Sequence, residues 1–201
     1  MRNERGQSMT EFLVILPVML FLIFGAIQFI LIYQTKTTLN YATFEATRAG
    51  SLEKASYSAV ANGFSRGLAP LFARFSTTNN KNEDLAAKVI SARQKVRDEL
   101  NAGHVKIELL NPTSVHFQRF GNPIPNDHLS FGGEDGIQDA NLLKLRITYC
   151  MKLIVPMVGG FISGVARGNC TDKENRFPIV SQSIIRMQTS AEKCKEAKCF
   201  D

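Results

Sequence analysis

An apolar stretch near the N-terminus constrains the fold more than any other feature of the sequence. It runs from Phe12 to Tyr33, about 22 residues without a charged side chain, and Gln28 is its one strongly polar member. A helix of roughly 20 apolar residues is long enough to cross the hydrocarbon core of a bilayer. The stretch therefore predicts a retained transmembrane helix. It is too long for the apolar region of a secretory signal peptide, which runs roughly 7–15 residues.

The charges on either side of the stretch indicate its orientation. Arg2 and Arg5 precede it, and cytoplasmic flanks of membrane helices favour Lys and Arg. Lys36 on the far side argues mildly for the opposite orientation, but a tail this long can cross a membrane whatever its charge. We therefore expect a single-pass protein of the cytoplasmic (inner) membrane, with the N-terminus inside and the C-terminal domain in the periplasm.

One ionisable residue, Glu11, lies immediately before the apolar stretch. A carboxylate at this depth is either solvated among lipid head groups or functional, because a charge inside a membrane is costly. Glu11 is also the fifth residue after Gly6, which ends a short leader carrying two arginines.

The segment from Arg5 to Pro17, with the sequence RGQSMTEFLVILP, resembles the processing site of type IV prepilins. More narrowly, it is similar to the TadE-like minor pilins, or pseudopilins, of the tight-adherence pilus. In that family an aromatic or apolar residue follows the Glu, as Phe12 does here, and a Pro such as Pro17 comes about six residues on. The resemblance covers roughly residues 5–50, including the segment Tyr41–Gly50 that follows the apolar stretch.

The resemblance implies a route of processing and assembly. A membrane-bound prepilin peptidase would cut between Gly6 and Gln7 on the cytoplasmic side. Glu11 could then pair with the new amine of Gln7, in the same chain or in a neighbour, while Phe12 and Pro17 belong to the helix that packs during assembly. The implied partners are the peptidase, other pilin and pseudopilin subunits, the pilus-assembly machinery of the inner membrane, and the lipid bilayer.

The chain of 201 residues divides into three predicted parts: a leader (1–6), a transmembrane or pilin-type helix (7–35) and a periplasmic domain (36–201). Helical spacing predicts one helix from Lys36 to about Phe75 and another from about Asp84 to Leu100, separated by a polar loop at 76–83. Gly50 and Gly63 weaken the first of these by about 1 kcal/mol each relative to Ala.

After Gly103 the apolar residues recur every second position, which is typical of strands. Strands are predicted at Val105–Leu109, Val115–Phe117, Leu142–Val155 and about Phe177–Gln188. Helices followed by strands indicate an α+β fold, in which an antiparallel sheet packs on the helical stalk.

All four cysteines, Cys150, Cys170, Cys194 and Cys199, lie in the C-terminal quarter. An even number in a chain that leaves the cytosol suggests two disulfides. Proximity favours Cys150 with Cys170 and Cys194 with Cys199, although the sequence leaves the other pairings open. The CxxxxC spacing of the last two is a weak indication of zinc.

Other features give little indication of chemistry. His104, His116 and His128 lack metal-ligand spacing, and the acidic segment 126–139, around Asp135, lacks the order of an EF-hand loop. The apolar, glycine-rich segment 153–165 is either packed in the core or resting on the bilayer or a partner. No catalytic motif occurs, so we expect no enzyme activity, cofactor or metal.

The net charge of +6 is scattered, without a block of five like charges, and does not favour nucleic-acid binding. Three hypotheses remain: a TadE-like minor pilin, an unprocessed membrane-tethered module that binds an envelope partner, and a signal-anchored metal-dependent hydrolase. The second predicts that residues 1–6 stay on the mature chain. The third predicts a bound metal and a loss of activity when His104 or His128 is changed.

Overall fold

The computed structural model of the chain describes residues 7–73, 85–127, 136–155, 160, 170, 176–196 and 198–200. They fall into two compact units. The first comprises the described residues within 1–34 and 151–178, and the second comprises those within 35–150 and 179–201. One helix, α1 (Gln7–Leu52), contributes its N-terminal part to the first unit and its C-terminal part to the second.

In the first unit, α1 is helical throughout, including at Pro17. Its residues from Glu11 to Ile27 are exposed, except for the half-buried Gly25. A helix that is apolar on all sides is either buried in a large core or placed in a membrane. Since these side chains are not covered by the protein, the second alternative fits this part of α1.

In the second unit, one face of α1 is buried in the domain core. Its buried residues recur at the spacing of a helix face and are Leu39, Ala42, Thr43, Ala46 and Thr47. The helix α2 (Tyr57–Ala73) packs on this face through two glycines. A Cβ added at Gly67 would lie 2.5 Å from the Cα of Ala42, and one at Gly63 would lie 2.8 Å from the Cβ of Ala49. The glycines therefore allow the two helix backbones to approach closely.

The single helix predicted from Lys36 to Phe75 is wrong, because the chain turns between Leu52 and Tyr57. Lys54 and Ala55 adopt left-handed backbone angles, with φ of 57° and 60°. The N–H of Ala55 donates to the carbonyl of Gly50 (2.9 Å), which satisfies a carbonyl at the end of α1. The turn folds α2 back onto α1.

The second predicted helix is present as α3 (Leu85–Asn101), which packs on α2. Val96 and Leu100 are buried, as the sequence predicts, whereas Val89 is exposed. The helix is followed by Gly103, whose φ of +81° is readily adopted only by glycine. The predicted loop at 76–83 and the predicted first residue, Asp84, lie outside the described residues.

Among the described residues, three strands form an antiparallel sheet in the order β1–β2–β3. They are β1 (Val105–Asn111), β2 (Leu142–Lys152) and β3 (Arg176–Arg186). The first two pair in a regular register until an irregularity between Leu109 and Asn111. Alternation places one face of β2 in the core, as predicted; its buried residues there are Leu143, Leu145, Ile147, Tyr149 and Met151.

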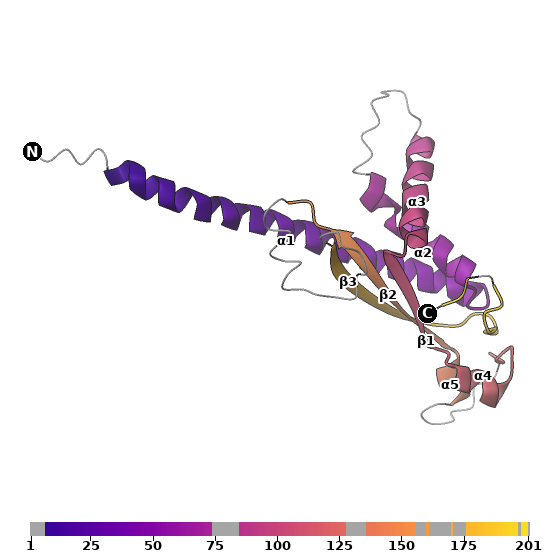
Figure 1. The fold of residues 1–201 in the computed structure, drawn as a ribbon. Coiled ribbons are helices and arrows are strands. Elements are labelled where there is room, and N and C mark those ends of the chain that lie inside the picture. Colours follow the sequence, from indigo (N-terminus) through magenta and orange to yellow (C-terminus); the bar gives the residue numbers. More distant parts are fainter. Residues whose placement is uncertain are drawn as a thin grey trace, which may run out of the picture. The chain divides into compact units, whose positions relative to one another are not determined.

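The strands run alongside the C-terminal part of α1 (Figure 1). Lys36 Nζ donates a hydrogen bond to the carbonyl of Val180, and Ser181 Oγ donates one to Asn40 Oδ1 (2.9 Å). A Cβ added at Gly50 would lie 2.9 Å from Leu143 Cδ2, so helix and sheet are in close contact. These contacts confirm the predicted α+β fold with the sheet on the helical stalk.

The strand predicted at Val115–Phe117 is wrong, because these residues lie in a helix, α4 (Ser114–Phe120). The backbone N–H of Thr113 donates to Nδ1 of the buried His116 (3.1 Å), and this bond caps the first turn. His116 also stacks on Phe120, with ring centroids 6.5 Å apart. A short helix, α5 (Ile137–Ala140), leads into β2.

Candidate functional site

The residues predicted for processing and assembly lie at the N-terminus of α1. Gln7 is the first described residue and the first residue of the helix, and Gly6 lies outside the described residues. Glu11 and Phe12 follow within the next turns, and both are exposed, Phe12 to 61%. Glu11 lies about one helical turn from Gln7, the residue that would become the mature N-terminus.

The apolar run that follows is the one helix, among those described, that is long and apolar enough to cross a membrane. A core helix of a soluble protein passes the same test of length and composition, but such a helix is mostly buried. Here the large side chains are open, with Leu13 66% and Leu22 61% exposed. Exposure of this kind is compatible with a single-pass membrane protein, because lipid replaces the missing protein contacts.

A second exposed apolar surface lies on α1 beyond the run, within the second unit. Tyr41, Phe44 and Leu52 are 56%, 47% and 54% exposed. On a helix of 3.6 residues per turn these positions fall on one side, opposite the buried face at Ala42 and Ala46. We call Tyr41, Phe44 and Leu52 the outer stripe. The described part of the domain does not cover these side chains, and the exposed Arg48 lies among them on the same side of the helix.

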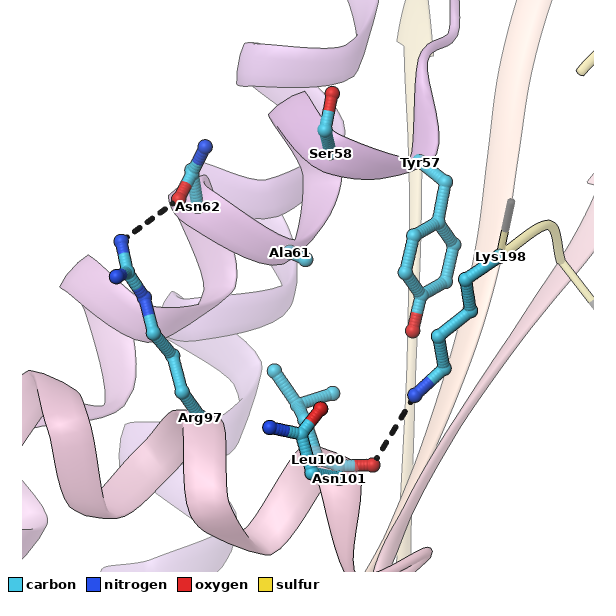
Figure 2. Close-up of a pocket in the computed structure, with 8 residues that line it drawn as sticks. All are labelled: Tyr57, Ser58, Ala61, Asn62, Arg97, Leu100, Asn101 and Lys198. Atoms are coloured by element: carbon cyan, nitrogen blue, oxygen red, sulfur yellow. Dashed lines mark hydrogen bonds between the residues drawn. The ribbon is translucent and has the colours of Figure 1, made fainter. Parts of the chain in front are cut away.

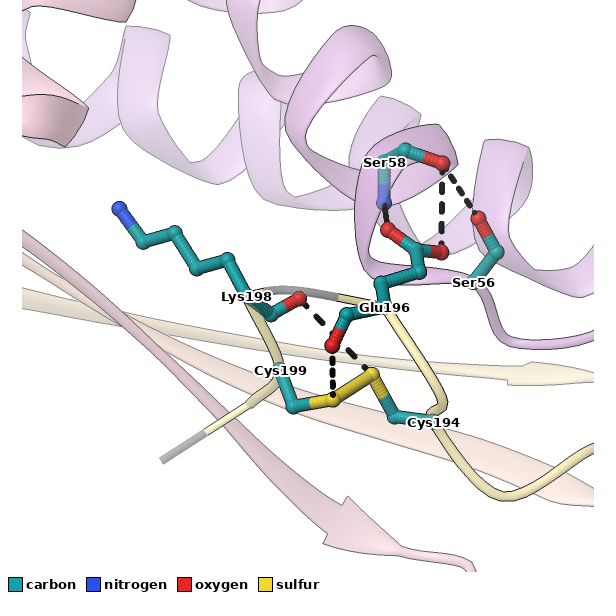
Figure 3. The surroundings of a disulfide bond; sticks show 6 residues. All are labelled: Ser56, Ser58, Cys194, Glu196, Lys198 and Cys199. Atoms are coloured by element: carbon teal, nitrogen blue, oxygen red, sulfur yellow. Dashed lines mark hydrogen bonds between the residues drawn. A yellow bond between two sulfur atoms is a disulfide. The ribbon is translucent and has the colours of Figure 1, made fainter.

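A disulfide joins Cys194 to Cys199 and closes a small loop near the start of α2 (Figure 3). Glu196, within this loop, accepts hydrogen bonds from the Ser58 backbone N–H (3.0 Å) and hydroxyl (3.3 Å). A carboxylate at this position satisfies an unpaired N–H of the helix start and interacts favourably with the helix dipole. The loop therefore caps α2 from a distant part of the sequence.

All four cysteines are in disulfides. The pairing of Cys194 with Cys199, favoured from the sequence, is the one present, and Cys150 and Cys170 are each disulfide-bonded. The short separation of Cys194 and Cys199 in the sequence indicated this disulfide. Nothing in the sequence indicated that Glu196 would cap α2, since Ser58 lies 138 positions earlier.

A cavity of about 210 Å³ opens between α2, α3 and the C-terminal segment (Figure 2). Two cations line it: Arg97 donates to Asn62 Oδ1 (3.1 Å), and Lys198 Nζ donates to the carbonyl of Leu100 (3.3 Å). Lys198 Nζ also lies 5.8 Å from the ring centroid of Tyr57. Cavities that bind small molecules are usually larger, roughly 300–1,000 Å³. Both cations already hold the surrounding elements together, which is a structural role.

The histidines and acidic residues do not form a metal site among the residues that the structure describes. His104 Nδ1 lies 2.9 Å from Glu99 Oε2, and His116 caps α4. His128 and Asp135 lie outside the described residues, as does most of the acidic segment 126–139. Of the apolar segment 153–165, residues 153–155 and 160 are described.

The N-terminal region of the chain is similar to a known protein family. Residues 6–48 match the family model described as TadE-like protein. The match spans the predicted cleavage position, Glu11, the apolar run and the buried face of α1 from Leu39 to Thr47. Neither the search of curated proteins nor that of solved structures gave a match.

Proposed function

We propose that the chain, whose residues 6–48 match the TadE-like family, acts as a minor pilin, or pseudopilin, in assembly of a tight-adherence pilus. The observation that carries the proposal is the coincidence of the family match with the helix α1. The matched residues include the part of α1 from Glu11 to Ile27, whose apolar side chains are not covered by the chain's own core.

Processing would begin the functional cycle. A prepilin peptidase cuts after Gly6, and the mature chain begins at Gln7, the first residue of α1. Glycine lacks a Cβ, so the chain at Gly6 can enter an extended protease cleft closely. The carboxylate of Glu11 then lies about one turn from the new amine and can pair with it, or with that of a neighbour, as the helix leaves the lipid.

Assembly, rather than catalysis, is the proposed activity. The apolar run packs first in the inner membrane and then among the helices of other pilin and pseudopilin subunits. The outer stripe extends the exposed apolar surface of α1 into the second unit, and Tyr41 and Phe44 offer aromatic contact area there. The domain beyond the span is periplasmic in this proposal, an oxidising space in which disulfides such as Cys194–Cys199 persist.

The test of processing is the N-terminal sequence of the mature protein, measured by intact-mass and peptide mass spectrometry in cells with the prepilin peptidase. We expect a chain that begins at Gln7. A Gly6→Val variant should keep residues 1–6, because the branched side chain obstructs the extended cleft. Gly25→Ala is the control, since a Cβ at Gly25 meets no atom within 4 Å, and it should be cut normally.

A mature chain that keeps Met1 to Gly6 would remove the minor-pilin proposal and favour a tethered envelope-binding module. A chain cut near residue 40 would instead indicate a secreted domain. Assembly is tested separately with Glu11→Gln, which removes the charge and retains the size of the side chain. We expect this variant to be cleaved but poorly incorporated into pili, whereas Glu53→Gln, in the exposed turn after α1, should assemble normally.

A further inference from the structure

The only strongly polar residue of the apolar run, Gln28, is fully buried. Its neighbours on α1 are not: Ile27, Phe29 and Ile30 are 44%, 65% and 56% exposed. Gln28 is covered on one side by chain that follows β2, because the backbone N–H of Val155 donates to Gln28 Oε1 (3.0 Å). Both residues belong to the first unit.

The depth of this contact follows from the helix itself. Gln28 lies five residues before Tyr33, the end of the apolar run, which is about 7 Å along a helix that rises 1.5 Å per residue. If the run spans the bilayer, this depth is in the outer part of the hydrocarbon or at its boundary with the head groups. The backbone N–H of Val155, which is hydrogen-bonded to Gln28, must therefore lie at the same depth in the membrane as Ile27 and Phe29.

The residues beside the contact suit that depth. Leu153 is 8% exposed and Ile154 is 57% exposed, so Ile154 presents an apolar side chain to the surroundings next to the lipid-facing part of α1. Val155 lies beyond the end of β2 at Lys152, so its N–H has no partner in the sheet ladder. Irregular backbone at membrane depth requires such polar groups to be bonded by protein, and Gln28 Oε1 provides the acceptor.

The same contact explains the burial of the glutamine. An amide facing lipid is costly, and covering Gln28 removes it from the lipid while pairing its oxygen. Its Nε2 has no hydrogen-bond partner among the described residues, so the amide is not completely satisfied. In water the opposite pattern would be expected. The apolar side chains of Ile27, Phe29 and Ile30 would be buried, and the amide of Gln28 could remain exposed, because water would hydrogen-bond to it.

We propose that residues Leu153–Val155 form a membrane-insertion point, in which Ile154 enters the outer leaflet and the Val155–Gln28 hydrogen bond fixes its depth. The partner is the acyl and glycerol region of the lipid bilayer. The chain would thus contact the membrane at two places, through α1 and through the segment after β2. This inference rests on the proposed membrane anchoring of α1, and the experiment separates the two.

The chain contains no tryptophan, so a single introduced Trp reports one position. Three variants of the full-length chain are placed in phosphatidylcholine vesicles with or without brominated acyl chains. Ile154→Trp tests the proposal, Phe21→Trp reports insertion of α1, and Leu52→Trp is the water-exposed control. Leu52 matches Ile154 in exposure, at 54% against 57%, and it lies on α1 itself, roughly 28 Å beyond Tyr33.

For Ile154→Trp we expect blue-shifted emission and a loss of about half of it or more in brominated vesicles, as for a side chain 5–10 Å inside the boundary. Phe21→Trp should behave in the same way, and Leu52→Trp should keep its emission. Quenching at Phe21 but not at Ile154 would overturn the insertion point and leave the anchor intact. Absence of quenching at Phe21 would overturn both the anchor and the insertion point.

A second measurement uses the unaltered chain, in case the Trp at position 154 disturbs the fold. Vesicles carry a lipid with a photoactivatable diazirine in the upper acyl chain, and adducts are mapped by fragmentation after trypsin cleavage at Lys152 and Arg167. Adducts at Leu153–Val155 support the insertion point. Adducts confined to α1 overturn it, because they show lipid reaching the helix but not the segment after β2.

Discussion

Because α2 approaches α1 closely at Gly67, replacing this glycine should lower the stability of the domain. Replacing Gly67 with Ala adds one methyl group 2.5 Å from Ala42 Cα, 3.0 Å from its Cβ and 3.3 Å from its N. Carbon atoms in good contact are roughly 3.5–4.0 Å apart. The helices must therefore separate by about 1 Å, because Ala42 is met at its backbone and no side-chain rotation relieves the contact.

Two opposing effects set the size of the change. Alanine is favoured over glycine in a helix interior by about 1 kcal/mol. Overpacking costs about 1–3 kcal/mol, and the higher values apply where the neighbouring atoms are rigid. We expect a net loss of about 1–2 kcal/mol, because Gly67 is buried and its neighbour is backbone. For a domain of this size that lowers Tm by roughly 2–8 °C.

The measurement is thermal unfolding of the full chain in detergent micelles, followed by circular dichroism, with protease resistance as a second readout. Gly63→Ala should shift Tm in the same direction, since its Cβ would lie 2.8 Å from Ala49 Cβ. Gly25→Ala, with no atom within 4 Å, should leave the domain unchanged. A Gly67→Ala variant as stable as the parent, or more stable, would refute the close helix contact.

Three further predictions concern stability. Replacing Cys194 and Cys199 with Ser should lower the free energy of unfolding by about 2 kcal/mol, the loop-entropy value for so short a loop, as measured by denaturant unfolding. Phe64→Ala should cost about 3–5 kcal/mol, because Phe64 is fully buried, and the same assay would show it. The hydrogen bond from Lys54 lowers the pKa of Glu192 below its ordinary 4.5. Because the folded chain favours the ionised carboxylate, this interaction stabilises the fold at pH values above 4.5. Part of this stability disappears as the pH falls through the lowered pKa, and Glu192→Gln, measured by Tm between pH 3 and 7, should flatten that dependence.

Much of the fold could be predicted from hydrophobic periodicity. The alternation in β2 predicted its buried residues from Leu143 to Met151, because a half-buried strand has a period of two that is visible locally. The apolar run predicted α1 for a similar local reason. The family resemblance was confirmed by the match at residues 6–48, the part of the chain where the sequence carries a specific motif.

The errors have identifiable causes. The turn after Leu52 was missed because its left-handed residues are Lys54 and Ala55, and neither is typical of that conformation. Val115 and Phe117 alternate as a strand would, but the local bond between Thr113 and His116 starts a helix instead. Gly63 was interpreted only as a weakness in a helix, since nothing local indicates that Ala49 lies against it.

The contacts at the turn after α1 bear on the order in which the chain can fold. The carbonyl of Ser51 accepts the N–H of Gln188 (3.0 Å), and the N–H of Lys54 donates to the Thr189 hydroxyl (2.9 Å). These partners are made 135 or more residues later than the turn they hold. A ribosome adds roughly 5–20 residues per second, so the turn waits on the order of ten seconds for them. Until then the α1–α2 corner is held only by its local contacts, such as the bond from Ala55 to Gly50 and the packing of Gly67 on Ala42.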